Sequence, residues 1–196
     1  HQSSTAAFLT LNPKAICLND MGCVDASTEY LSPTGWRRMD EYDGGQVAQF
    51  HPSTRAIEFV EPTEYVKKPC TAMLHFTTPY TDQMLSIEHR VLLYRPDGSW
   101  VVKSAEQVAQ ALTNYPEELR GMEFDAWGKR VPAFPEGATK VRWAQPADGY
   151  KYCFMVPSTF LLLRRNGCIF ATGNTGKTVS VLWAADYLMG LNKMRK

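Results

Sequence analysis

The chain has 196 residues, a hydrophobic fraction of 44% and a formal net charge of +1. This length and composition suit one compact domain with short additions at its ends, and the near balance of charge gives no indication of a nucleic-acid or membrane surface. No apolar run approaches the length of about 20 residues that a membrane-spanning helix needs.

The cysteines are odd in number and form no Cys-x-x-Cys pair. A zinc site or a disulfide framework is therefore not expected. Free thiols in a reducing, cytoplasmic compartment are the simpler interpretation. The five are Cys17, Cys23, Cys70, Cys153 and Cys168.

Residues 1–22 look like a fragment of a larger fold. A short apolar run over 15–18 predicts a buried strand, and it stops at Asn19-Asp20-Met21-Gly22 without a partner element of its own.

Residues 23–174 differ from this start because short runs of β-forming residues alternate with turn signals. Asp43-Gly44-Gly45, Arg95-Pro96-Asp97-Gly98 and Asn166-Gly167 mark three of the turns. Many short strands separated by turn chemistry indicate an all-β domain. Strands are predicted at 46–50, 56–60, 91–94, 100–102, 140–143, 160–163 and 168–170.

One helix is predicted over 105–112, with Ser104 as its N-cap. Residues 113–139 are rich in proline and glycine, and we interpret them as a linker. The acidic residues of this half are scattered, so no metal site is predicted.

Four stretches of residues 23–174 carry side chains suited to chemistry on a peptide bond. They are Cys23 at the start, Ser86 and His89 within Leu85-Ser86-Ile87-Glu88-His89-Arg90-Val91-Leu92, Cys153 within Tyr152-Cys153-Phe154-Met155-Val156-Pro157, and Gly173-Asn174 before Thr175. A cysteine thiolate is accessible near neutral pH and strongly nucleophilic. An asparagine can cyclise onto its own backbone carbonyl, which breaks the bond on its C-terminal side.

Each stretch also has a purely structural interpretation. Cys23 and Cys153 would be small hydrophobic residues, His89 a surface residue beside Glu88, and Asn174 part of a turn. A simple turn at Asn174 does not account for the Gly-Lys-Thr sequence at 176–178.

Residues 175–196 look like the partner of the first fragment. Thr175-Gly176-Lys177-Thr178 precedes apolar residues at helical spacing. Joined to Asn19-Asp20-Met21-Gly22, this tetrapeptide gives Asn-Asp-Met-Gly-Thr-Gly-Lys-Thr. Strand, glycine-rich turn and helix start in this order form a phosphate-binding loop, because backbone N–H groups and the helix dipole face the anion.

In the order and spacing of these motifs, residues 23–174 resemble a minimal intein of the Hedgehog/intein (HINT) family, and the joined flanks resemble the first motif of helicase-like, SNF2-type ATPases. The resemblance implies an all-β, horseshoe-like fold with one or two short helices. It divides the chain into an N-terminal extein fragment, 1–22, a splicing domain, 23–174, and a C-terminal extein fragment, 175–196.

The resemblance also implies the chemistry of the first junction. Cys23 attacks the carbonyl of Gly22, His89 protonates the peptide nitrogen, and Ser86 hydrogen-bonds the same linkage. Cys153 helps to couple the two junctions. Ser86 stands where the family usually has threonine, and Cys153 where it usually has aspartate.

At the second junction, Thr175 takes over the acyl group as a branched ester, and Asn174 cyclises to a succinimide. Gly22 is thereby joined to Thr175. The domain is then a single-turnover autocatalyst, not a turnover enzyme, and it needs no metal, nucleotide or other cofactor. Lys177 and Thr178 bind phosphate and magnesium only in the spliced host.

Two further positions depart from the family pattern. Gly173 stands where a histidine is commonest, and Phe160 stands where many inteins have a second histidine. The proton donor for Asn174 is then either missing or supplied by a residue elsewhere in the sequence. A cleavage-only HINT domain is therefore one alternative, and an ATP-binding domain with an inserted β module is another.

The expected partners are the chain's own flanking exteins, with no nucleic acid and no membrane. If the intein is naturally split, Met39 is the candidate first residue of the longer piece, which would pair with a complementary fragment ending at Arg38. We expect a phage or bacterial origin.

Overall fold

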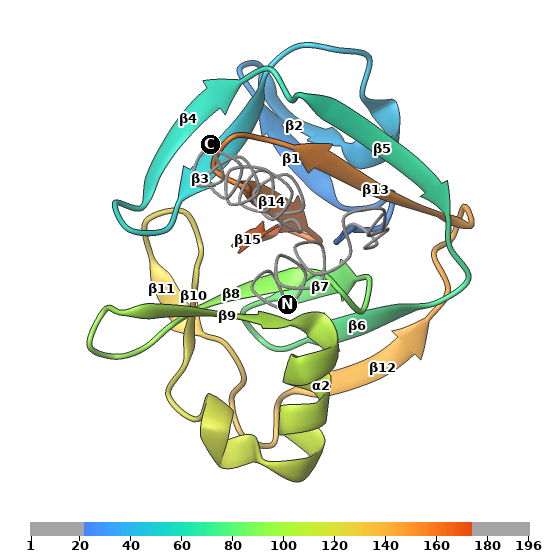
Figure 1. The fold of residues 1–196 in the computed structure, drawn as a ribbon. Helices are drawn as coiled ribbons and strands as arrows, with labels where there is room; N and C mark the ends of the chain where they lie inside the picture. The colour runs from blue at the N-terminus through green and yellow to red at the C-terminus, as the bar shows by residue number, and fades with distance from the viewer. Residues whose placement is uncertain (1–21, 174–196) are drawn as a thin grey trace, which may run out of the picture. The chain divides into compact units, whose positions relative to one another are not determined.

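The computed structural model describes residues 22–173, which form a β domain with one α-helix, α2, and two short 3₁₀ helices (Figure 1). The helices of this part are η1 (Met39–Glu41), α2 (Ala105–Asn114) and η2 (Pro116–Leu119). The strands are β1 (Glu29–Ser32), β2 (Gly35–Arg38), β3 (Val47–His51), β4 (Ala56–Val60), β5 (Glu64–Pro69), β6 (Met73–Thr77), β7 (Asp82–Leu85), β8 (Arg90–Tyr94), β9 (Trp100–Ser104), β10 (Glu123–Asp125), β11 (Arg130–Pro132), β12 (Lys140–Ala144), β13 (Tyr150–Met155), β14 (Phe160–Arg165) and β15 (Cys168–Gly173).

A sheet of ten strands forms most of the domain. Its main path runs β11-β10-β8-β15-β14-β1-β2, with β3 and β4 joined through β14 and β9 joined through β8. A three-stranded sheet, β12-β6-β7, and the pair β13-β5 complete it. The hairpin β14-β15 lies at the centre of Figure 1, between the first strands of the chain and the β8-β9 region.

The predicted strands are confirmed with small shifts in their ends. The hairpin β14-β15 illustrates why the turn signal works. Asn166 and Gly167 both have positive φ, +46° and +78°, as a two-residue turn between right-twisted strands requires, and Asn and Gly tolerate this conformation best.

The predicted helix is confirmed and extends two residues beyond its expected end. Ser104 caps it, because its Oγ accepts a hydrogen bond from the Gln107 N–H at 3.1 Å while Gln107 Oε1 accepts one from the Ser104 N–H at 2.8 Å. Ala105, Val108 and Ala111 are buried at helical spacing. Within residues 22–173, no helix has the length and apolar character to cross a bilayer.

The interpretation of residues 113–139 as a linker was wrong. This segment contains η2, β10 and β11, and β10 pairs with β8 of the large sheet. Leu119, Phe124 and Ala133 are buried in the core. The turns rich in proline and glycine concealed these few anchoring apolar residues, each separated from the next by polar sequence.

Candidate functional site

The peptide bond between Gly22 and Cys23 is buried in the domain. Cys23 is fully enclosed, and Gly22 is buried as well. The Cys23 N–H donates to Ser86 Oγ at 2.9 Å, and the Ser86 N–H donates to the Cys23 carbonyl at 2.9 Å. Ser86 therefore holds Cys23 from both sides of its Cα, and its hydroxyl contacts the linkage that the sequence predicted.

Residues 86–89 form a turn between β7 and β8. The His89 N–H donates to the Ser86 carbonyl at 2.9 Å, which closes the turn. Because Ser86 and His89 are the first and last residues of this turn, their side chains approach the same peptide bond. Glu88, between them, forms an ion pair with Lys151 of β13 at 2.9 Å, which fixes the turn. His89 is not the surface residue beside Glu88 that a purely structural interpretation implied.

His89 is buried and bridges the two ends of the domain. Its Nε2 lies 2.7 Å from Thr172 Oγ1, and Thr172 Oγ1 donates to the Arg90 carbonyl at 3.1 Å. The hydroxyl thus has a lone pair left for an Nε2–H, which favours the tautomer with its lone pair on Nδ1. Among the described residues, that Nδ1 is buried without a well-formed hydrogen bond, and it lies against Gly22.

Burial lowers the pKa of His89 to about 3. Desolvation disfavours the imidazolium, and this outweighs the opposing effect of the Gly22 backbone. The ring is therefore neutral near pH 7. A neutral imidazole with a free Nδ1 lone pair can accept a proton and return it to a neighbouring atom.

Cys153 lies beside Cys23. Val24, the residue after Cys23, is fixed to β13 by a reciprocal pair of hydrogen bonds with Tyr152, each 2.8 Å. Cys23, Cys153 and Val66 form a small buried cluster. A hydrogen bond between the two thiols, together with burial, raises the pKa of Cys153, so this thiol stays protonated at neutral pH.

Asp25, Asp82 and Arg165 form a network of largely buried charged side chains. Arg165 forms ion pairs with both Asp25 and Asp82, and Asp82 accepts hydrogen bonds from His75 and Asn166. Burial alone would raise the pKa of Asp82, but these hydrogen bonds and the charge of Arg165 lower it to about 2. The network connects the start of the domain to the β14-β15 hairpin.

Gly173 is the last described residue and is paired with Arg90 in the β8–β15 ladder. The Arg90 guanidinium lies 4.6 Å from the centre of the Phe160 ring, and its Nη1 donates to Thr159 Oγ1 at 3.0 Å. Since β8 begins directly after His89, the same strand reaches both ends of the domain. Asn174, Thr175, Lys177 and Thr178 lie outside the described residues.

The structure thus brings Gly22, Cys23, Ser86, His89 and Cys153 together, with Gly173 paired to the residue after His89. The sequence did not indicate Thr172 or Arg90. Both are placed by the pairing of β8 with β15, and only their positions beside His89 and Gly173 could have suggested them.

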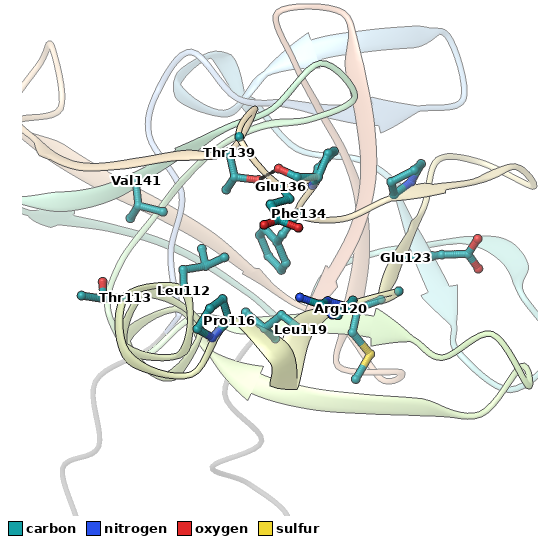
Figure 2. A pocket seen from close by; sticks show the side chains of 15 residues that line it. Leu112, Thr113, Pro116, Leu119, Arg120, Glu123, Phe134, Glu136, Thr139 and Val141 are labelled. Carbon is teal, nitrogen blue, oxygen red and sulfur yellow. Dashed lines mark hydrogen bonds between the residues drawn. The ribbon is translucent and has the colours of Figure 1, made fainter.

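One cavity of the described domain lies away from the candidate residues that the structure describes. It has a volume of about 620 Å³ and lies between α2, η2 and the segment 132–141. Figure 2 shows Leu112, Leu119 and Phe134 on its walls, with Arg120 at its edge. Its lining contains none of Gly22, Cys23, Ser86, His89, Cys153 and Gly173, the candidate residues within 22–173. Among residues 22–173, no three histidine, cysteine or acidic side chains gather as a metal site would require.

No known family profile matches the sequence, and no curated protein matches it. Solved structures do. A splice-inactive variant of the AceL NrdHF class 3 split intein superposes with a TM-score of 0.63 at 17% identity, over 78% of this chain and 98% of that one. A KlbA intein precursor from Methanococcus jannaschii gives 0.57 at 13% identity, over 84% and 97%.

A bacterial intein-like domain from Clostridium thermocellum gives a TM-score of 0.52 at 16% identity, over 76% of this chain and 96% of that one. At these identities the likeness concerns the fold alone. The domain has the all-β fold of the Hedgehog/intein family, as the resemblance of its motifs implied.

Proposed function

We propose that residues 23–174 are an autocatalytic splicing domain that excises itself and joins Gly22 to Thr175. The observation that carries this proposal is the buried Gly22–Cys23 peptide bond, with a thiol, a hydroxyl and a neutral imidazole around it in an intein fold. A peptide bond at the edge of an ordinary domain has no reason to be enclosed by such groups.

In the first step, Cys23 Sγ attacks the Gly22 carbonyl carbon. A carbon–sulfur bond forms, the bond to the Cys23 nitrogen breaks, and the thiol proton moves to that nitrogen. His89 Nδ1 carries the proton, because its lone pair faces the linkage and its Nε2–H is held by Thr172. Ser86 Oγ orients the nitrogen that must be protonated. A planar amide has little basicity at nitrogen, so this delivery is needed.

In the later steps, Thr175 Oγ attacks the thioester and releases the Cys23 thiol. Asn174 then cyclises, which breaks its bond to Thr175 and frees the 152 residues from 23 to 174. The ester on Thr175 rearranges to an amide. All of these steps are intramolecular, so proximity supplies much of the acceleration. The contact between His89 and Thr172 supports this, since it ties the residues beside both junctions together.

Cys153 and Arg90 have supporting roles in this scheme. Cys153 forms a hydrogen bond with the Cys23 sulfur. This hydrogen bond changes when the sulfur becomes acylated, so Cys153 can couple the state of the first junction to the rest of the site. Arg90 is cationic and faces Gly173 across the β8–β15 ladder. It can supply the charge near the second junction that Gly173 itself lacks.

We further propose that the flanking segments belong to a helicase-like ATPase whose phosphate loop is restored by splicing, in a phage or bacterial cytoplasm. The 44 flanking residues, 22 on each side, are the partners of the domain. A complementary fragment is a second kind of partner if the chain is naturally split before Met39.

Met39, the candidate first residue of the longer piece, begins the short helix η1. Its side chain is buried, and its N–H donates to the Thr28 carbonyl at 2.9 Å. A chain that begins at Met39 would place its terminal ammonium at this carbonyl, which remains a suitable acceptor. A split at this point is therefore compatible with the fold only when the first piece is bound.

The intact masses present after expression and incubation test the proposal. A free domain of 152 residues together with a ligated peptide of 44 residues is the expected result. Unligated pieces would indicate the cleavage-only alternative. One unchanged mass, with nucleotide bound, would indicate an ATP-binding domain with an inserted module.

Three variants separate the steps. Cys23→Ala should stop release of residues 1–22, Thr175→Ala should permit the thioester but prevent ligation, and Asn174→Ala should retain the branched ester. Cys168→Ala is the matched control, because this thiol is partly exposed and lies on the turn side of β15. Normal ligation by Thr175→Ala would contradict the mechanism.

A further inference from the structure

Gly22 occupies a space with no room for a side chain. A Cβ atom at this position would lie 2.7 Å from His89 Cα, 3.2 Å from His89 Nδ1 and 3.4 Å from His89 Cβ. Carbon atoms in contact are normally about 3.5–4.0 Å apart. The closest of these contacts is with the backbone of residue 89, so no change of rotamer can remove it.

The backbone of His89 is fixed on both sides. Its N–H donates to the Ser86 carbonyl at 2.9 Å, and its carbonyl accepts from the Ala105 N–H, the first residue of α2, at 2.8 Å. The next residue, Arg90, is already in the β8 ladder with Ser104 and Gly173. The turn that faces Gly22 cannot retreat without loss of these hydrogen bonds.

The chain after Gly22 is fixed as firmly. Cys23 is held through its N–H and its carbonyl by Ser86. Val24 is held by both of its hydrogen bonds to Tyr152. Gly22 is thus confined between two backbone segments, neither of which is free to move. A larger residue can be accommodated only if the Gly22–Cys23 linkage leaves its position.

We infer that the position of Gly22 is a glycine-only subsite, so that this domain processes only upstream segments that end in glycine. The inference rests on the proposed splicing function and names its substrate class. Selectivity arises because a Cβ would displace the scissile carbonyl from Cys23 Sγ and would break the hydrogen bond from Cys23 N to Ser86 Oγ. Displacements of about 1 Å at a reacting centre can cost about 100-fold in rate.

The inference also explains where such a domain can be inserted. A host must offer a glycine directly before the insertion point, and glycine-rich phosphate loops offer several. Asn19-Asp20-Met21-Gly22 ends in one of them. Gly22 meets two requirements at once. The phosphate loop needs a residue whose backbone can approach phosphate closely, and the subsite needs a residue without a Cβ.

Thioester formation can be measured alone in an Asn174→Ala, Thr175→Ala background, as the rate at which added dithiothreitol releases residues 1–22. Gly22, Gly22→Ala and Gly22→Val would be compared in this background. We expect release from Gly22→Ala to be at least about 10-fold slower and release from Gly22→Val to be undetectable. The thermal unfolding of each variant, with Cys23→Ala added to prevent cleavage, serves as the folding control.

The outcomes separate the inference from the proposed function. Equal release from Gly22 and Gly22→Ala would overturn the glycine subsite and leave splicing intact. Absence of release from the Gly22 parent would overturn both. Cooperative unfolding of Gly22→Ala at nearly the parent temperature, together with slow release, supports the inference. It would show that the Gly22–Cys23 linkage is displaced while the domain stays folded. Loss of cooperative unfolding would contradict it.

Discussion

The ring of Phe160 occupies the space into which a side chain at Gly173 would project. A Cβ on Gly173 would lie 2.9 Å from Phe160 Cε1 and 3.1 Å from Arg90 Cβ. The two positions at which the chain lacks a usual intein histidine, 160 and 173, therefore form one structural feature. Phe160 fills the volume, and a glycine is required opposite it in the β14–β15 ladder.

Restoration of the usual histidine by Gly173→His alone should slow cleavage at the second junction, because the new side chain meets the Phe160 ring. The double variant Gly173→His, Phe160→Ala should recover part of the rate. Cleavage can be followed by mass as release of residues 175–196 in the Cys23→Ala background. Faster cleavage by the single variant than by the parent would contradict this steric account. Phe160→Ala alone should cost about 3–5 kcal/mol of stability.

Replacement of Thr172 by valine should slow thioester formation. Valine keeps the shape of threonine but leaves His89 Nε2–H buried without its acceptor, at a cost of about 1–3 kcal/mol. Thr172→Ser retains the hydroxyl and should keep a rate near that of the parent. The measurement is again release of residues 1–22 by dithiothreitol. A slow serine variant beside a fast valine variant would exclude a role for the hydroxyl.

The unfolding free energy should decrease as the pH is lowered below about 6.5, because of His89. In the unfolded chain this histidine binds a proton near its ordinary pKa, whereas burial lowers its pKa in the folded domain to about 3. The unfolding free energy should decrease by about 1.4 kcal/mol per pH unit over this range.

Urea unfolding between pH 7 and pH 4 of a splicing-blocked variant, with and without His89→Gln, isolates this effect. The glutamine variant should lack the difference in slope. Asp82 does not interfere, because the stability that its low pKa of about 2 provides is lost only below its ordinary value of 3.8. Identical slopes would show that His89 is protonated when folded.

The adjacent residues Arg164 and Arg165 should differ in their contribution to stability. Arg165→Ala removes the cation that pairs with the largely buried carboxylates of Asp25 and Asp82 and should cost about 3–5 kcal/mol. Arg164 pairs with Glu29 at a more exposed position, so Arg164→Ala should cost about 1 kcal/mol or less. Unfolding in urea at pH 7 compares the two, and equal losses would contradict the assigned burial.

Local signals predicted much of the fold. The Asn166-Gly167 turn, the Ser104 cap and the strands around them depend on residues near each other in sequence. The pairs β5-β13 and β6-β12 were not predicted, because each joins strands far apart in the chain whose register is set by the whole core. The burial of Phe124 could not be predicted for the same reason, since it depends on the pairing of β10 with the distant strand β8.

The candidate site was predicted from the order and spacing of several motifs that resemble those of inteins, because no single residue's chemistry was sufficient. Cys23, Ser86 and His89 are brought together because the last two close one turn. Thr172 could not be found in this way, since a threonine in a strand has many ordinary roles. Gly173 was recognised as a departure, but its cause is the ring of Phe160, and only the β14–β15 register reveals it.

The pairing of β1 with β14 has a consequence for a chain that begins at Met39. Without residues 23–38, β14 would present an open sheet edge where Tyr30 and Glu29 now pair with Leu163 and Arg164. An apolar edge of this kind recruits other chains and promotes aggregation, which charged side chains on the edge oppose. Arg164 and Arg165 lie at the end of that edge. The cations that pair with the first segment would therefore also oppose aggregation of the longer piece before the first piece binds.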